Sequence, residues 1–183
     1  MSKTGNILSG SASRGIKDSR RLLKKYFFNC FLLTIPVLVW DYIFTDKLPS
    51  LFQPENFWKD IPAFIAYGEN ISRLVMFVFI SLMPLKIIND KKKCGLLLYV
   101  AGVLLYFAAW VVLIYFPTTA WSNSVFGLLA PAYTPLFWLA GIGFIGDSLF
   151  FNIPYKRWLY FLLATIFLIF HNWHTYLIYF RTH

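Results

Sequence analysis

Residues 95–116 read GLLLYVAGVLLYFAAWVVLIYF, an apolar run without a charged side chain. At 1.5 Å per residue, a helix of this length measures about 33 Å and matches the roughly 30 Å hydrocarbon core of a bilayer. Gly95, Gly102 and Ala109 recur at a spacing of seven along this run. Such a stripe of small residues lets a second helix approach closely. The run therefore predicts a membrane-spanning helix with one face prepared for packing.

Four further apolar stretches flank this run, at 26–44, 61–88, 128–150 and 158–179. The stretch 61–88 is too long for one upright span. We therefore expect a break at Tyr67-Gly68, with a short interfacial helix near 54–67 and a span at 69–88; one long tilted helix is the alternative. Pro131 and Pro135 predict a kink near the start of the stretch at 128–150. The predicted fold is an all-α polytopic membrane helical bundle with five transmembrane helices.

Composition supports the membrane class and excludes nucleic acid as a partner. The chain is 58% hydrophobic and 14% charged, with a mean hydropathy of +0.60, whereas soluble domains have about 25% charged residues. The formal charge of +9 comes from basic residues at span ends, where membrane orientation explains them. We predict two parts, a basic and partly disordered N-terminal segment at 1–25 and a single transmembrane domain at 26–183.

The distribution of Lys and Arg predicts the orientation. Most of them lie in the N-terminal segment, in the turn 86–93 and in the turn 156–157, which five spans would place on one side of the membrane. The positive-inside rule makes that side cytoplasmic, with the C-terminus outside. The chain is then a multi-pass protein of the plasma membrane or a bacterial inner membrane. Residues 15–25 predict a surface helix attracted to anionic lipid head groups, or a simple topology anchor.

Ionisable residues inside the predicted spans are the main functional signal, because a charge at membrane depth is costly and normally faces a bundle interior. Rise per residue places five of them about 20–26 Å above the cytoplasmic ends of their spans. We expect these five to converge in one site in the outer half of the bilayer; the alternative is separate groups that reach outward to water. The five are Asp41, Glu69, Arg73, His171 and His174.

Asp147 lies apart from this layer, near the cytoplasmic end of its span, where it either pairs with Lys156 or Arg157 or lines an inner vestibule. The glycines at 141–146 match the G-x-G-x-x-G pattern, which binds dinucleotides only between a strand and a helix. Inside an apolar span the pattern favours close helix packing instead. No cofactor is identified from the sequence.

Local spacing leaves several roles open for the outer layer. Glu69 and Arg73 stand at i, i+4 and can pair on one helix, which lowers the membrane penalty without requiring a function. His171 and His174 stand at i, i+3, a spacing that suits metal binding, proton transfer or a structural role. We predict no metal site, because only two ligands lie close together in the sequence.

Together these features predict a small membrane-embedded enzyme or binder that acts on an apolar or lipid-like small molecule by acid–base chemistry. Whether it is an enzyme stays open. One alternative is a non-catalytic accessory subunit of a membrane complex, with a membrane protein partner or further copies of itself. The other is a subunit of a proton-coupled transporter. The predicted catalytic residues are Asp41, Glu69, His171 and His174, and the predicted substrate-binding residues are Asn70, Arg73, Tyr133 and Asn172.

Overall fold

The computed structural model describes residues 26–151 and 153–182, and this part of the chain is all-helical. The predicted surface helix at 15–25, its contact with anionic head groups and the disorder expected within 1–25 lie outside the described residues. In chain order the elements are η1 (Cys30–Leu33), α2 (Ile35–Phe44), η2 (Thr45–Lys47), η3 (Ser50–Phe52), α3 (Pro54–Phe57), α4 (Ala63–Ser81), α5 (Asp90–Tyr115), α6 (Val125–Leu128), α7 (Ala130–Tyr133), α8 (Pro135–Ile145) and α9 (Arg157–Thr182).

Three helices, α4, α5 and α9, are long and apolar enough to cross a membrane. They cover most of the predicted spans at 69–88, 95–116 and 158–179. The other two predicted spans contain shorter helices. Within 26–44, helix α2 begins only at Ile35, because Pro36 occupies its first turn and has no N–H for a preceding turn. The expectation of a membrane protein is supported, whereas the number of five spans stays a prediction.

Helix α4 differs from the prediction at both ends. The predicted break beside Gly68 is wrong, because α4 runs through this position as one continuous helix. A Cβ at Gly68 would overlap the ring of Phe170 on α9, so this glycine serves a helix contact. The chain reverses earlier, at Asp60, whose φ of 55° lies in the left-handed region. Helix α4 ends at Ser81 rather than at 88, since Pro84 cannot continue the hydrogen-bond ladder.

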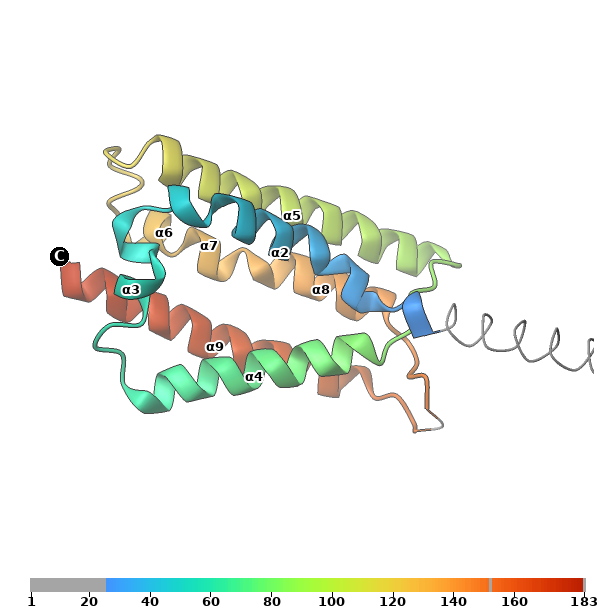
Figure 1. Cartoon of the computed structure of the whole chain (residues 1–183). Helices are drawn as coiled ribbons and strands as arrows, with labels where there is room; N and C mark the ends of the chain where they lie inside the picture. The colour runs from blue at the N-terminus through green and yellow to red at the C-terminus, as the bar shows by residue number, and fades with distance from the viewer. Residues whose placement is uncertain (1–25, 152, 183) are drawn as a thin grey trace, which may run out of the picture.

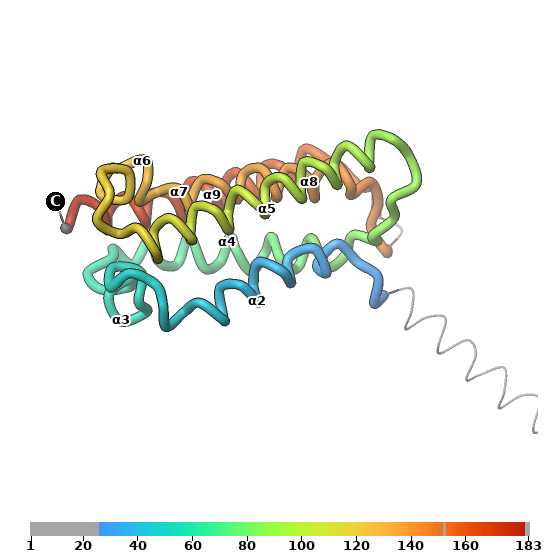
Figure 2. The backbone as a smooth tube through the Cα atoms, turned by 90° about the horizontal axis from the view of Figure 1, so that it is seen from above, coloured from blue at the N-terminus to red at the C-terminus, as the bar shows by residue number. Residues whose placement is uncertain are grey.

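The helices lie side by side, and their connections gather at two opposite ends (Figure 1). One end holds the first described residues, the turn before α5 and the segment between α8 and α9; the other holds α3, α6 and the end of α9 (Figures 1 and 2). Backbone bonds connect the first end, where the Leu85 amide donates to the Phe28 carbonyl and the Phe150 amide to the Leu82 carbonyl. Helix α3 lies at the second end; its placement at a membrane interface stays a prediction.

Helices α5 and α8 pack closely along glycines. A Cβ at Gly102 of α5 would overlap the backbone of Trp138, and one at Gly141 of α8 would overlap the backbone of Tyr99. The predicted packing face of the run at 95–116 is therefore confirmed, with α8 as its partner. The glycines at 141–146 serve packing as well, since a Cβ at Gly143 would meet the Tyr160 ring.

The predicted kink near 128 takes the form of two helix breaks, because Pro131 and Pro135 each occupy the first turn of a new short helix. Side chains of α9 bind backbone carbonyls of this segment. The Asn172 Nδ2 donates to the Ala132 carbonyl at 3.0 Å, and the Tyr160 hydroxyl donates to the Leu139 carbonyl at 2.7 Å. Apolar surroundings require such partners, since they contain no water to bind the carbonyls.

Helix α2 is attached to α5 mainly through side chains. The Tyr99 hydroxyl donates to the Leu33 carbonyl at 2.8 Å. The rings of Trp40 and Phe107 stack with centroids 4.3 Å apart. Because long side chains rather than close backbones join α2 to α5, space remains beside α2, and the cavities described below occupy it.

Candidate functional site

Glu69 of α4 is fully buried, and three side chains lie within hydrogen-bond distance of its carboxyl group. Its Oε1 accepts from the Arg73 guanidinium on the next turn of α4 and faces His171 Nδ1 of α9 at 3.0 Å. Its Oε2 faces His174 Nδ1 of α9 at 2.5 Å. Four of the five residues predicted to converge therefore meet, with Arg73, His171 and His174 around the carboxyl group of Glu69, which joins α4 to α9.

His174 has an oxygen at each ring nitrogen, and this fixes the proton count of the cluster. Its Nε2 lies 2.8 Å from the carbonyl oxygen of Phe57, in addition to the bond between Nδ1 and Glu69. A neutral imidazole donates from only one nitrogen, and a backbone carbonyl only accepts. The pair therefore carries one extra proton, either on His174 as an imidazolium or on Glu69 as a carboxylic acid.

His171 differs from His174 because only one of its nitrogens is engaged. Its Nδ1 faces Glu69, whereas no hydrogen bond joins its Nε2 to any residue in 26–151 or 153–182. Its ring stacks on Phe167 with centroids 5.3 Å apart and an interplanar angle of 13°. Donation of Nδ1–H to a carboxylate leaves the lone pair on Nε2, which is the arrangement of a general base.

Asp41 of α2 does not contact the Glu69 cluster. Its Oδ1 accepts from the Tyr106 hydroxyl of α5 at 2.6 Å, and it forms no salt bridge with the described part of the chain. It lines the same two cavities as His171, and one of these cavities also includes Arg73. The fifth predicted residue thus shares space with the cluster without bonding to it.

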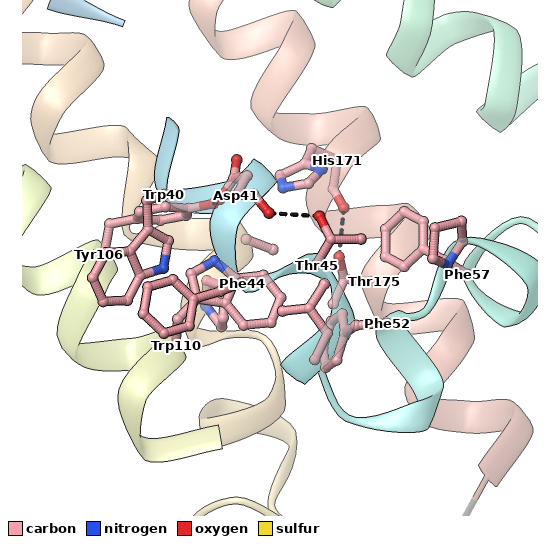
Figure 3. Close-up of a pocket in the computed structure, with 14 residues that line it drawn as sticks. Trp40, Asp41, Phe44, Thr45, Phe52, Phe57, Tyr106, Trp110, His171 and Thr175 are labelled. Atoms are coloured by element: carbon pink, nitrogen blue, oxygen red, sulfur yellow. Dashed lines mark hydrogen bonds between the residues drawn. The ribbon is translucent and has the colours of Figure 1, made fainter. Parts of the chain in front are cut away.

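Two cavities meet at this level of the bundle. The outer cavity, of about 230 Å³, lies toward α3, and the inner one, of about 170 Å³, lies toward η1. Asp41, Tyr106 and His171 line both and separate them. Figure 3 shows the outer cavity, with the His171 ring extending from α9 toward the part of α2 that carries Asp41. The outer cavity is also lined by Trp40, Phe44, Thr45, Leu48, Phe52, Pro54, Phe57, Trp110, Pro131, Ala132 and Thr175.

Each cavity has a buried indole N–H without an acceptor. Trp40 lines the outer cavity and Trp138 the inner one, and neither Nε1 has a hydrogen-bond partner among the described residues. Buried donors are nearly always paired in folded proteins.

The remaining predicted binding residues lie elsewhere. Asn70 donates to the Ala66 carbonyl one turn back on its own helix, on an exposed face. Asn172 donates to the backbone of α7. Tyr133 is half-buried and lines neither cavity. These positions indicate structural contacts for Asn172 and no contact with the cavities for the other two.

Asp147 pairs with Lys92 rather than with Lys156 or Arg157. The Lys92 Nζ lies 2.6 Å from Asp147 Oδ2, and Lys92 is almost fully buried whereas Asp147 is 44% exposed. Partial burial raises the pKa of Asp147, but the hydrogen bond and charge of Lys92 overcome this and hold the pKa below its usual value. This ion pair joins the start of α5 to the end of α8, far from the cavities.

No group of three or more His, Cys, Asp or Glu side chains in the described ranges could hold a metal ion. His174 illustrates the reason, since both of its nitrogens already face oxygens. A metal ligand needs a free lone pair on nitrogen. The spacing of His171 and His174 therefore serves the binding of Glu69.

Sequence reasoning missed Tyr106 and the Phe57 carbonyl. Tyr99 and Tyr106 stand seven residues apart in α5, on one helix face, and their hydroxyls bind Leu33 and Asp41. That spacing was a usable signal for polar contacts in an apolar span. The Phe57 carbonyl had no such signal, because a backbone acceptor depends only on the path of the loop.

No protein-family model matches the chain, and searches of curated proteins and of solved structures find no match either.

Proposed function

We propose that this protein is a multi-pass membrane protein that binds an apolar or lipid-like small molecule in its outer cavity and acts on it by acid–base chemistry at His171. The proposed topology has five crossings, with a cytoplasmic N-terminus and the cavity in the outer half of the bilayer. Support for this topology comes from the two ends of the bundle, since the basic turn before α5 and the turn before α9 lie together (Figure 1).

One observation carries the proposal: His171 lines both cavities through a ring that Glu69 holds by Nδ1. The free Nε2 is then the nitrogen that takes a proton from a bound molecule. The imidazolium formed in this way is stabilised by the Glu69 carboxylate. The proton is returned from Nε2 to the product, so His171 ends the cycle neutral.

The other groups act on the ligand or on His171. Glu69 is a positioning residue, and His174 and Arg73 hold its carboxylate in place. Asp41 and the Tyr106 hydroxyl contact the polar end of the ligand, since both face the space shared by the two cavities. The aromatic lining supplies the apolar contact area.

The test is extraction of the protein purified in mild detergent, followed by mass spectrometry of bound small molecules. We expect one apolar species near one equivalent per chain, retained by His171→Gln and lost by Trp110→Ala. If wild-type protein carries only bulk lipid and detergent, the binding role is wrong. A stable co-purifying membrane protein without a bound small molecule would instead favour the accessory role.

A proton-coupled transporter is the second candidate, because the two cavities are stacked along α2 and meet at Asp41 and His171. Alternating access needs such a division between an outer and an inner space, and ionisable groups at depth suit proton relays. Proton flux in liposomes that contain the purified protein tests this function. Flux equal to that of empty liposomes excludes it.

A further inference from the structure

Asp41 lies within a predicted span, and no cation among the described residues contacts its carboxylate. Its Oδ1 accepts from the Tyr106 hydroxyl, and it forms no salt bridge with Lys, Arg or His in residues 26–151 and 153–182. Arg73 is already bound to Glu69. Carboxylates within membrane segments normally pair with a charge of opposite sign. The described part of the chain therefore supplies no cation in contact with Asp41.

Aromatic rings surround the space in front of this carboxylate, as Figure 3 shows. Trp40 stacks on Phe44 with centroids 4.2 Å apart, and Phe52 meets the Trp110 ring edge-on at 5.0 Å. Phe44 and Phe107 both stack on Trp40, and the Lys47 Nζ lies 5.5 Å from the centroid of the Phe44 ring, so Phe52 and Trp110 are the lining rings whose faces these contacts leave uncovered. Aromatic faces attract cations, most strongly where water is excluded.

The size of the cavity limits what it can hold. Sites for drug-sized ligands occupy about 300–1,000 Å³, and the outer cavity is smaller, at about 230 Å³. Trp40, Asp41 and Phe44 are each partly exposed, so the cavity opens to the surface beside α2. A compact head group fits these dimensions, with an apolar tail that leaves along α2 into the surrounding hydrocarbon.

We propose that the outer cavity binds an ammonium group, primary to quaternary, with Asp41 as its counter-ion and the rings of Phe52 and Trp110 as its aromatic contacts. This inference rests on the proposed binding function and names the class of molecule that the cavity selects.

The experiment compares two amphiphiles with the same alkyl tail, one ending in a trimethylammonium group and the other in its neutral tert-butyl isostere. Binding to the full chain is measured by tryptophan fluorescence in maltoside micelles, which carry neither amine nor charge. The isosteres share size and shape, so their difference reports the charge alone. We expect the ammonium probe to bind about tenfold more tightly or better.

Asp41→Asn is the decisive variant, because the amide oxygen still accepts from Tyr106 while the charge is lost. It should remove the preference for the ammonium probe. Asp46→Asn is its matched control, since Asp46 is exposed one turn further along the chain, and it should keep the preference. Phe52→Leu serves as a second variant, which should weaken binding of the ammonium probe more than binding of the neutral one.

The outcomes separate this inference from the proposed function. Equal binding of both probes, unchanged in Asp41→Asn, overturns the ammonium inference and leaves a neutral apolar ligand. Binding of neither probe overturns the binding function as well. A third probe with the same tail and a phosphocholine head distinguishes the two sources of an ammonium group. Binding of this probe that depends on Asp41 indicates a lipid head group. If the ammonium probe binds and the phosphocholine probe does not, the ligand is a free amine.

Discussion

Helices α5 and α8 meet along glycines, whereas α4 and α9 meet around a buried carboxylate. In the first pair, Gly102 and Gly141 bring the backbones together without an ion pair at the point of contact. In the second, Glu69 binds Arg73 of its own helix and both histidines of α9. Residues of both pairs line the cavities, but His171 of the second pair is the lining side chain that the buried carboxylate holds.

The comparison shows which helix contact depends on a buried charge and which does not. Close glycine packing needs no buried charge. A buried carboxylate is stable only while all of its partners remain. The second arrangement is therefore more fragile, and the following substitutions test this difference.

Glu69→Ala should have the largest effect, a loss of about 4 kcal/mol in the free energy of unfolding, because Arg73, His171 and His174 would lose their shared acceptor. Denaturant unfolding in mixed micelles, followed by circular dichroism, measures it. Glu55→Ala removes the same side chain from an exposed position of α3 and should leave stability unchanged. Equal stability of the two variants would contradict the central role of Glu69.

Gly102→Leu should cost about 3 kcal/mol, because the new side chain would force α8 away from α5. Ala101→Leu adds a leucine at the neighbouring position, which is exposed on the same helix, and should be tolerated. The same unfolding experiment compares them. A Gly102→Leu variant as stable as wild type would show that the two helices separate easily.

His174→Phe should cost about 2 kcal/mol, since the ring is kept while Glu69 Oε2 and the Phe57 carbonyl lose their donor. Its specific signature is faster hydrogen exchange at residues 54–60, measured by mass spectrometry. His171→Phe is the control, because His171 has no bond to this segment and exchange there should stay slow. Unchanged hydrogen exchange at residues 54–60 in His174→Phe would show that His174 does not hold α3 to α9.

The Lys92–Asp147 pair should have the smallest effect, at most about 1 kcal/mol, because Asp147 is largely solvated. Its lowered pKa favours the folded state at all pH values above the unfolded pKa of about 3.9. That contribution is lost as the pH falls through the lower folded value. The measurement is the free energy of unfolding of wild type minus that of Asp147→Asn between pH 2 and 6. This difference should fall as the pH is lowered through the folded pKa of Asp147. A difference that does not change with pH would contradict a contribution from the ion pair.

Depth was predictable from sequence because the rise of a helix is constant. Counting residues from the basic turns was enough to bring Glu69, His171 and His174 to one level, and the i, i+4 spacing was enough to pair Glu69 with Arg73. The face that each helix turns to its neighbours was harder to predict. Asp41 therefore meets Tyr106 rather than the cluster, since the rotation of α2 is set by contacts with another helix.

Helix ends and ion-pair partners were less predictable for a different reason. Hydrophobic runs show where apolar surface begins and ends, but Pro36 and Pro84 decide where a helix can start or stop. Likewise, Lys92 reaches Asp147 from the start of another helix, a contact between residues far apart in sequence that spacing along one helix does not reveal.

The segment from 56 to 59 is held to α9 through its backbone. His174 faces the Phe57 carbonyl, and Arg181 donates to the carbonyls of Asn56 and Lys59. Carbonyls are common to all residue types, so the contacts made by His174 and Arg181 do not depend on which side chains stand at 56 and 59. Lys59 can therefore change in related sequences or in engineered variants without loss of these contacts, whereas the Asn56 side chain also donates to the Ser50 carbonyl. A change at His174 or Arg181 would remove the bonds that these side chains make to the segment.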